Sequence, residues 1–454
     1  MAKVEEAAKV VKEISKEEPI KIVGHIDADG ISATAIVMKV LQRLGYQFSV
    51  SNIQQLSVRT LVDLKEEPYQ HYIFVDLGSS LLDEIEKIIP ERQVIILDHH
   101  IPKGNGKALH VNPHLFGIDG GSAISGAGVC YLFAKAVSIQ NKDLAHLGII
   151  GALGDSQYTD SFGELNTLIL KDAVESSKMA VEKGLRIFGF HTRPLYKALC
   201  HSGELVIPDV TGSESGAIQF LTDIGIHPKA GAGWRTLSTL TKEEEKTLIE
   251  GVILRRQGEK VPEDVFGERF VLAEEDRESY FYEAKEFSTL LNACGRLHRI
   301  GVGLSICLGG KEAKQKAQKV LQDYKYELTA ALDWLRASKD VVKGRSWMLA
   351  NAKDRVKATI VGTVASMVTK GKIFDVDYVI IMARDGEGHS KISMRSSHDG
   401  LDDVRSLLEK AAVTVDGESG GHAQAAGALI PVDKEEDFIS EMKLVLDKKV
   451  IEKN

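Results

Sequence analysis

Short apolar runs alternate with helical patterns over the first 200 residues of the chain. Runs rich in Val and Ile, bounded by polar turns, predict buried strands at 20–23, 72–75 and 94–97. Between them, apolar residues recur at helical spacing in 31–44 and 81–89. Strands that alternate with helices in this way favour a parallel sheet with crossover helices. The predicted fold class is therefore α/β, and a ligand is expected beyond the carboxyl ends of the strands.

Acidic and histidine side chains gather at the ends of apolar runs in the same region. The clusters are His25-Ile26-Asp27-Ala28-Asp29, Asp76, Asp98-His99-His100, and Asp155. If 24–29 continues the first strand, His25, Asp27 and Asp29 alternate and face one site. Each cluster alone could be a turn or a helix cap. Together they offer more ligands than one metal ion needs, which is the excess that a two-metal phosphoesterase requires.

The segment Asp98-His99-His100 directly follows the apolar run 94–97. Because adjacent residues of an extended segment face opposite ways, we expect one imidazole to bind metal and the other to face substrate. Asp98 is expected behind them, where it fixes an imidazole tautomer. Carboxylate and imidazole ligands without thiolates suit Mn²⁺ or Mg²⁺, with Mn²⁺ the better match.

Length and composition place only broad limits on function. A chain of 454 residues exceeds what one core usually supports, so two or three domains are expected. No apolar run reaches the roughly 18 residues of a membrane-spanning helix, and the amino terminus lacks the apolar core of a signal peptide. The four cysteines never form a Cys-x-x-Cys pair, which indicates free thiols. These features predict a cytoplasmic protein without a membrane partner.

Net charge neither supports nor excludes nucleic acid as a partner. At −8 the chain is acidic, whereas phosphate contacts need Lys and Arg. A site filled with carboxylates carries its compensating charge as metal, however, and a residue count leaves that charge out. The charge is also uneven, with nine basic against five acidic residues at 311–345 and four against ten at 259–286.

The pattern changes along the chain and predicts four parts. They are a first domain at 1–195, a helical insert or linker at 196–285, connecting helices at 286–345 and a second, smaller α/β domain at 346–454. Helices are expected at 286–297 and 311–338. Strands are expected at 302–308, 358–361, 376–382 and 391–394.

Two consecutive glycines precede a histidine near the carboxyl end, at Gly420-Gly421-His422. Consecutive glycines let backbone N–H groups approach a phosphate closely, and a neighbouring histidine adds charge. A tight turn between a strand and a helix is the structural alternative. The motif alone favours that alternative, and only the other clusters make a phosphate site the better interpretation.

Taken together, these motifs resemble those of the DHH phosphoesterase superfamily, which is named for the Asp-His-His seen here at 98–100. The segment 419–427 resembles the Gly-Gly-His signature of the DHH-associated C-terminal domain, with Ser419 where many relatives have a third glycine. Asn292-Ala293-Cys294-Gly295-Arg296 resembles a segment that RecJ-like members carry between their domains. The resemblance is greatest to the archaeal RecJ-like exonucleases, a group that includes a nuclease associated with the replisome GINS complex.

The resemblance implies a role for each matching position. The implied metal ligands are His25, Asp27, Asp29, Asp76, His99 and Asp155, with Asp76 bridging two ions. His100 would contact the scissile phosphate or assist protonation, with Asp98 behind it. The implied substrate-binding residues are Asn292, Arg296, Arg395, Gly420, Gly421 and His422.

The predicted function is a two-metal exonuclease for single-stranded nucleic acid, with single-stranded DNA degraded from the 5′ end favoured. The resemblance implies a place in DNA repair or replication. Three alternatives stay open: a 3′ to 5′ exoribonuclease, a phosphodiesterase for cyclic dinucleotides or very short oligonucleotides, and a replisome scaffold related to the eukaryotic helicase-associated RecJ homologue. In the last case, the helical insert would be the surface for a GINS-like partner.

Overall fold

The computed structural model describes residues 1–202, 205–371, 373–397 and 403–452, with the backbone alone at 422 and 448–452. The chain divides into two compact units, Met1–Leu321 and Gln322–Asn454, and each is described by itself below. The long helix α13 (Lys311–Ala337), which the sequence predicted, contains the division.

A five-stranded parallel sheet lies at the centre of the first unit, in the order β2-β1-β3-β4-β5. Its strands are β1 (Ile20–His25), β2 (Phe48–Ile53), β3 (His71–Val75), β4 (Gln93–Leu97) and β5 (Leu109–Val111). The prediction of a parallel sheet is confirmed, together with its three most apolar strands. The two strands that the sequence did not predict, β2 and β5, lie at the sheet edges, where burial demands fewer apolar residues.

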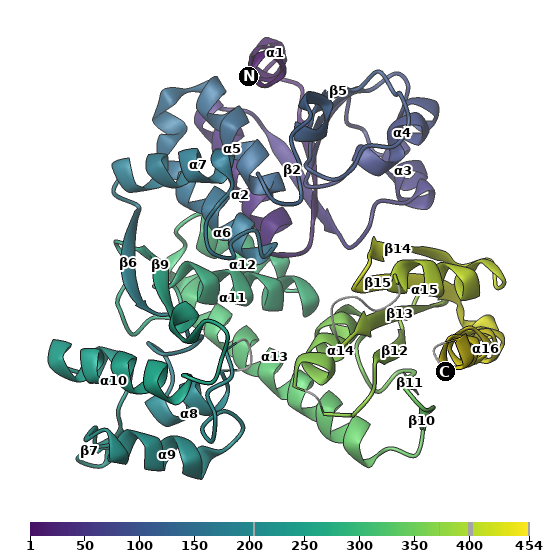
Figure 1. Ribbon diagram of the computed structural model, residues 1–454. Helices are drawn as coiled ribbons and strands as arrows, with labels where there is room; N and C mark the ends of the chain where they lie inside the picture. The colour runs from purple at the N-terminus through teal and green to yellow at the C-terminus, as the bar shows by residue number, and fades with distance from the viewer. Residues whose placement is uncertain (203–204, 372, 398–402, 453–454) are drawn as a thin grey trace. The chain divides into compact units, whose positions relative to one another are not determined.

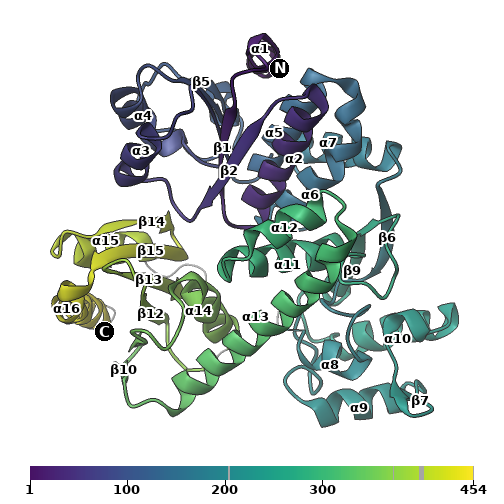
Figure 2. The ribbon, with the colours of Figure 1, turned by 180° about the vertical axis from the view of Figure 1, so that it is seen from behind.

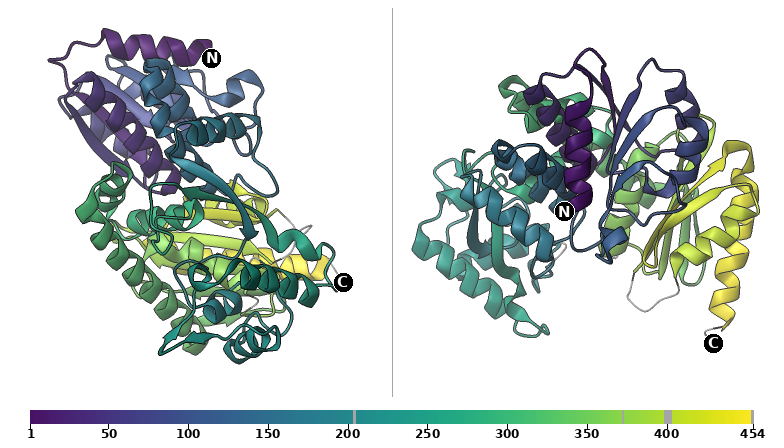
Figure 3. Two further views of the ribbon diagram at one scale, coloured as in Figure 1. Left: turned by 90° about the vertical axis from the view of Figure 1, so that its left-hand side faces the viewer. Right: turned by 90° about the horizontal axis from the view of Figure 1, so that it is seen from above.

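Helices cover both faces of this sheet (Figures 1 and 2). One face is covered by α3 (Val58–Lys65) and α4 (Leu82–Ile88), and the other by α2 (Ala28–Leu44) and α5 (Gly126–Val137). Successive side chains of a strand point to opposite faces of the sheet, so one strand contributes apolar residues to both helix-covered faces. In β3, Tyr72 and Phe74 join the core under α3 and α4, while Ile73 and Val75 face the opposite way. The amino-terminal helix α1 (Ala2–Glu13) packs against α5 and β5 (Figure 3).

A separate helical module follows the sheet and has its own hydrophobic core, which runs from Leu185 to Val265. Its helices are α8 (Leu195–Cys200), α9 (Glu214–Asp223) and α10 (Lys242–Arg255), and it also contains a small hairpin of β7 (Lys229–Ala230) and β8 (Gly233–Trp234) (Figure 1). An antiparallel ribbon of β6 (Met179–Leu185) and β9 (Phe266–Leu272) joins it to the sheet domain. The module overlaps the helical insert predicted at 196–285, although the ribbon was not predicted.

Helices α6 (Ala145–Gly154), α7 (Glu164–Glu175), α11 (Ala284–Arg296) and α12 (Ile300–Cys307) complete the first unit. The predicted strand at 302–308 is wrong, because these residues form α12. A short apolar run suits a strand or a buried helix equally well. Here the run packs against α2 and α11, where an apolar helix buries two sides at once.

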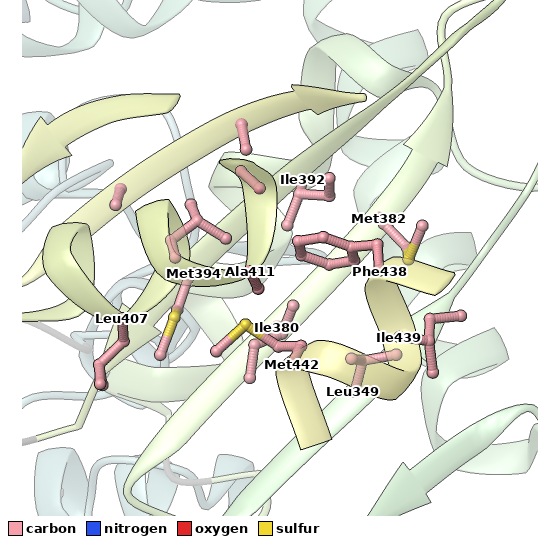
Figure 4. Close-up of a cluster of buried hydrophobic side chains, with 14 of the residues drawn as sticks. Leu349, Ile380, Met382, Ile392, Met394, Leu407, Ala411, Phe438, Ile439 and Met442 are labelled. Carbon is pink, nitrogen blue, oxygen red and sulfur yellow. The ribbon is translucent and has the colours of Figure 1, made fainter. Parts of the chain in front are cut away.

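The second unit is built on a six-stranded mixed sheet in the order β10-β11-β12-β13-β15-β14. The strands are β10 (Val341–Lys343), β11 (Trp347–Asn351), β12 (Tyr378–Arg384), β13 (His389–Ser396), β14 (Glu418–His422) and β15 (Ala425–Pro431). One face packs on α15 (Val404–Val413) and α16 (Glu435–Glu452) through a core that includes Met394 and Phe438 (Figure 4). The opposite face packs on α14 (Val361–Lys370).

The strand predicted at 358–361 is also wrong. Residues Ala358–Ile360 form a 3₁₀ turn that leads directly into α14. The run has the β-branched residues of a strand, but its apolar pattern continues at helical spacing through Val364, Ala365 and Val368, all of which are buried. The helical spacing of the apolar residues over 358–368 therefore outweighs the short β-branched run, and the segment leads into a helix.

The cysteines and the longest apolar helices bear on two expectations from composition. Cys130, Cys200, Cys294 and Cys307 are free thiols, as predicted. Within the described ranges, no helix is both long enough and apolar enough to cross a bilayer.

Candidate metal centre

The carboxyl ends of three neighbouring strands meet at one edge of the first sheet. β1 ends at His25, β3 is followed by Asp76, and β4 is followed by Asp98. The strand order reverses between β1 and β3, which is where open α/β sheets bind ligands. Asp155 reaches the same place from the end of α6, a helix that packs against α2 and α5.

Asp76 stands between two groups of potential ligands and presents one carboxylate oxygen to each. Its Oδ2 lies 3.6 Å from Nδ1 of His25, and the same nitrogen lies 2.9 Å from Oδ2 of Asp27. Its Oδ1 lies 3.3 Å from Nε2 of His99. The residue has a left-handed backbone with φ of 59°, which turns the chain sharply at the end of β3.

The second group is centred on His99. Its Nε2 lies 3.3 Å from a carboxylate oxygen of Asp155 and 3.7 Å from one of Asp29. Ligand atoms of these three residues all lie within 4.8 Å of one another, as do those of the first group. The structure thus brings together all six predicted metal ligands: His25, Asp27, Asp29, Asp76, His99 and Asp155.

The local geometry of the first motif differs from the prediction. β1 ends at His25 and does not continue to Asp29, so these side chains do not alternate along a strand. Asp27 is instead the N-cap of α2 and accepts a hydrogen bond from the N–H of Gly30, 2.9 Å away. Asp29 lies in the first helical turn. The preference of aspartate for helix caps overrides the extended pattern, and the turn of the helix still directs both carboxylates to the site.

The imidazoles of His25 and His99 each contact a backbone carbonyl through one ring nitrogen. Nε2 of His25 lies 3.0 Å from the carbonyl oxygen of Gln54, and Nδ1 of His99 lies 2.7 Å from that of Gly120. In the neutral ring, donation to the carbonyl leaves the other nitrogen with a lone pair. These contacts therefore aim Nδ1 of His25 and Nε2 of His99 at the centre.

Asp29 is fully buried and is held by the start of α5. Its two oxygens accept hydrogen bonds from the N–H groups of Gly126 and Ala127, at 2.6 and 2.9 Å. The helix N-terminus stabilises the negative charge and fixes the orientation of the carboxylate.

Asp98 is buried beside the two histidines and contacts His100. Its Oδ1 is 2.8 Å from Nδ1 of His100 and accepts a hydrogen bond from the N–H of His99, while Oδ2 accepts one from the N–H of Ser79. These bonds, headed by that to His100, hold the pKa of Asp98 well below its usual range although burial opposes ionisation. The side chain of His100 is 55% exposed.

Three buried polar atoms of the centre make no well-aligned hydrogen bond among the described residues, although carboxylate oxygens lie 2.9–3.7 Å from the two nitrogens. They are Nδ1 of His25, Oδ1 of Asp76 and Nε2 of His99. Buried polar atoms that are poorly satisfied cost free energy, up to about 1–3 kcal/mol each. A divalent cation would satisfy all of them, and carboxylate and imidazole donors suit Mn²⁺ or Mg²⁺. The residues present therefore fit a bound metal.

The crowded carboxylates and imidazoles have perturbed pKa values. Burial and the neighbouring Asp76 raise the pKa of Asp29 to about 7, and burial and Asp29 raise the pKa of Asp155 well above its usual range. For His25 and His99 burial opposes the charged form, but the carboxylates beside them raise the pKa of both imidazoles. Without a cation, the raised pKa values favour the protonated forms of these groups, and a bound divalent cation would compete with the protons.

Helix α11 packs on the loop between β1 and α2 and positions it. Asn292 accepts a hydrogen bond of 3.0 Å from the N–H of Ala28, a residue 264 positions earlier in the chain. A β-carbon at Gly295 would overlap the carbonyl oxygen of Ile26, so only glycine allows this close approach. The side-chain oxygen of Asn292 is thus occupied by the hydrogen bond with Ala28. The half-buried Arg296 follows at the end of the helix, and its contact with substrate stays a prediction.

In the second unit, β13 presents Arg395 on the face covered by α14. Alternation along the strand places Ile392 and Met394 in the core on the other face. Nε of Arg395 donates a hydrogen bond of 3.1 Å to Oγ of Ser366, and Nη1 donates to the carbonyl of Met394 at 2.9 Å. Ser366 is a residue that the sequence analysis missed, because nothing in a serine on a helix indicates which strand it faces.

The two consecutive glycines lie on β14, an edge strand paired with β15, so the structural alternative of a strand-to-helix turn does not apply. Gly420 pairs with Gly427, and Gly421 has φ of 131°, a conformation that favours glycine. The side chain of His422 lies outside the described part of the chain. The joint use of 292–296 and 395–422 on one substrate stays a prediction.

Three domain families match the chain. The DHH family N-terminal domain matches residues 19–152, the DHH-CID domain matches 187–267 and the DHHA1 domain matches 345–448. The order agrees with that of the sheet domain, the helical module and the second unit.

Two curated relatives illustrate the similarity. An uncharacterized protein of Methanocaldococcus jannaschii is 29% identical over 98% of this chain and 98% of its own length. The single-stranded-DNA-specific exonuclease RecJ of Haemophilus influenzae is 28% identical over 46% of this chain, a match that spans 38% of the RecJ length.

Solved structures share the fold. RecJ of Thermus thermophilus in complex with Mn²⁺ has a TM-score of 0.61 at 17% identity, covering 98% of this chain and 55% of that one, and a second structure with Mg²⁺ has a TM-score of 0.54. CDC45 of Entamoeba histolytica has a TM-score of 0.63 at 13% identity, covering 97% of both chains. At such identities, the likeness shows the fold alone.

Proposed function

Because this chain belongs to the DHH superfamily and is RecJ-like in its domains, we propose that it is a divalent-metal-dependent exonuclease for single-stranded nucleic acid. The observation that carries the proposal is the position of Asp76, with one carboxylate oxygen facing each group of ligands. A carboxylate so placed suits two cations roughly 3.5–4 Å apart. The resemblance to RecJ favours single-stranded DNA degraded from its 5′ end. The similarity to the single-stranded-DNA-specific exonuclease of Haemophilus influenzae supports single-stranded DNA as the substrate.

Two Mn²⁺ or Mg²⁺ ions are the proposed cofactors. The residues that would hold them are His25, Asp27 and Asp76 on one side and Asp29, His99, Asp155 and Asp76 on the other. When bound, the ions would activate a water nucleophile and stabilise the negative charge that develops on the phosphate. The Thermus relative, solved with each of these ions, supports the choice of metal.

The protein's own part in the reaction is to orient groups around the phosphate. Asp98 holds the His100 ring by Nδ1, which leaves Nε2 to contact the scissile phosphate or to protonate the leaving oxygen. Arg296 and Arg395 would bind phosphate oxygens, as would the backbone N–H groups near Gly420.

The decisive assay uses matched single-stranded DNA and RNA oligonucleotides labelled at the 5′ end and incubated with Mn²⁺. Immediate release of labelled mononucleotide from DNA is the expected result. A ladder that shortens from the 3′ end, chiefly on RNA, would replace the proposal with a 3′ to 5′ ribonuclease on the same centre. A series of strand lengths separates an exonuclease from an enzyme for dinucleotides, since only the latter stalls beyond a few nucleotides.

A scaffold role is the second candidate, and the likeness to CDC45 over nearly the whole chain favours it. A scaffold has no need for six converging ligands, so we rank it below the nuclease or beside it as a dual role. A GINS-like partner would bind the helical module of 185–265. If deletion of this module left the binding of such a partner unchanged, that assignment would be rejected.

Ser366 is expected to position Arg395 for substrate. Ser366→Ala removes the acceptor at Arg395 Nε, so the KM for single-stranded DNA should rise about fivefold, an effect of roughly 1 kcal/mol, with kcat within about twofold. Ser366→Thr should restore the KM. Thr369→Ala on the same helix is the matched control, because its hydroxyl donates to the carbonyl of Ala365 within α14. A fall in kcat without a change in KM would contradict a positioning role.

A further inference from the structure

We propose that Ile101, Leu115 and Phe116 form an apolar platform on which the nucleobase beside the scissile phosphate stacks. This inference rests on the proposed function, since it assigns a base subsite to the same centre. Here the name platform means these three side chains. They are 68%, 50% and 54% exposed, respectively.

The platform is exposed although it stands on a well-anchored turn. Pro113–Phe116 form a 3₁₀ turn capped by Asn112, whose Oδ1 accepts a hydrogen bond from the N–H of His114. Gly117 ends the turn by donating to the carbonyl of His114. Apolar side chains held rigidly in water lose favourable burial, and such groups often mark a contact surface.

Hydrogen bonds tie the turn to the catalytic motif at both ends. Before the turn, Nδ2 of Asn112 donates to the carbonyl of His100, 2.8 Å away, and Ile101 is the next residue after His100. After the turn, the carbonyl of Gly120 accepts from Nδ1 of His99, and the N–H of Gly120 donates to Nε2 of His114. The turn that carries Leu115 and Phe116 is therefore hydrogen-bonded to the backbone of His100, which is proposed to face the phosphate, and is followed by the contact with the ring of His99, a proposed metal ligand.

The chemistry of the platform matches a base better than a phosphate or a sugar. An aromatic ring with two aliphatic neighbours supplies stacking and dispersion but has no hydrogen-bonding group to read a base edge. Stacking tolerates every base, because each has a π-face. The platform would thus hold the nucleotide without sequence preference, as an exonuclease that moves along a strand requires.

The test combines a protein change with a substrate change. The full chain and Phe116→Ala are compared with Mn²⁺ on single-stranded DNA that carries either a normal terminal nucleotide or an abasic one. Phe116→Ala should raise the KM for the normal strand about tenfold, within the range for the loss of one base–aromatic contact, with kcat within about twofold. The abasic strand should bind the unmodified protein equally weakly and lose nothing further in the variant.

Two further variants serve as controls for this result. Phe116→Tyr keeps the ring and should keep the KM, whereas Leu254→Ala, at a residue 61% exposed on α10 of the helical module, should change nothing. Equal losses for the normal and abasic strands would overturn the platform, because a purely structural role gives that pattern. An unchanged KM in Phe116→Ala would also overturn it. If the unmodified protein degrades no single strand, the proposed function itself fails and the platform falls with it.

Discussion

Asp76→Ala is expected to abolish Mn²⁺-dependent cleavage, with a loss of roughly a thousandfold or more, equivalent to about 4 kcal/mol of transition-state stabilisation. The reason is that this carboxylate faces both ligand groups, so its removal damages both metal positions at once. Initial rates on single-stranded DNA measure the loss. A second readout is independent of activity: Mn²⁺ should raise the unfolding temperature of the unmodified protein but not that of the variant.

The left-handed backbone of Asp76 decides which control is needed. Alanine at φ of 59° costs about 1–2 kcal/mol, whereas asparagine tolerates this conformation. Asp76→Asn should therefore lose activity and the Mn²⁺ response while its unfolding temperature in EDTA stays within about 4 °C of the original. Asp63→Ala, at an exposed carboxylate of α3, is the matched control and should retain both. Substantial activity in a folded, pure Asp76→Asn protein would contradict the proposed centre.

Gly295→Ala is expected to disturb the metal centre without touching a ligand. The added methyl group would meet the backbone carbonyl of Ile26, which cannot move without displacing Asp27 and the first turn of α2, where Asp29 lies. Forced overpacking of this kind costs typically about 1–3 kcal/mol of unfolding free energy. It should also weaken the hydrogen bond from Ala28 to Asn292 and lower the affinity for Mn²⁺. Thermal unfolding and calorimetric titration with Mn²⁺ measure the two effects.

Gly301→Ala on the adjacent helix α12 is the matched control. Among the described residues, nothing beyond its chain neighbours and its own helical backbone lies within 4 Å of a β-carbon added there, so the helix should gain up to about 1 kcal/mol from the better propensity of alanine. Opposite effects at the two glycines would attribute the damage at 295 to the contact with Ile26. Unchanged stability and Mn²⁺ affinity in Gly295→Ala would show that α11 does not position the loop.

The clustering of the candidate site residues was predictable because they stand at the ends of apolar elements. Periodicity identifies such elements, and a parallel sheet brings the ends of its strands to one edge, so Asp76 and Asp98 could be expected side by side. The placing of His25 and Asp27 was predicted for a wrong reason. A strand and a capped helix start both direct alternating polar residues toward a sheet edge, and sequence alone does not distinguish them.

Errors arose where short apolar runs lacked a decisive period. The run 302–308 forms helix α12 because it packs between α2 and α11. The sequence of the run itself does not indicate which elements it will pack against. The run 358–361 became the start of α14 for the same kind of reason. Tertiary packing overrides the weak local preference of β-branched residues.

The sequence by itself determined the α/β class and indicated a cluster of carboxylates and imidazoles as the candidate site, because these depend on local periodicity and on residue type. The tertiary structure alone decided how the ligands are held. The contact of Asn292 with Ala28 joins residues 264 positions apart, and the carbonyls that orient His25 and His99 come from backbone that carries no side-chain signal. Long-range backbone contacts leave no pattern in a single sequence, since almost any residue can supply an N–H or a carbonyl.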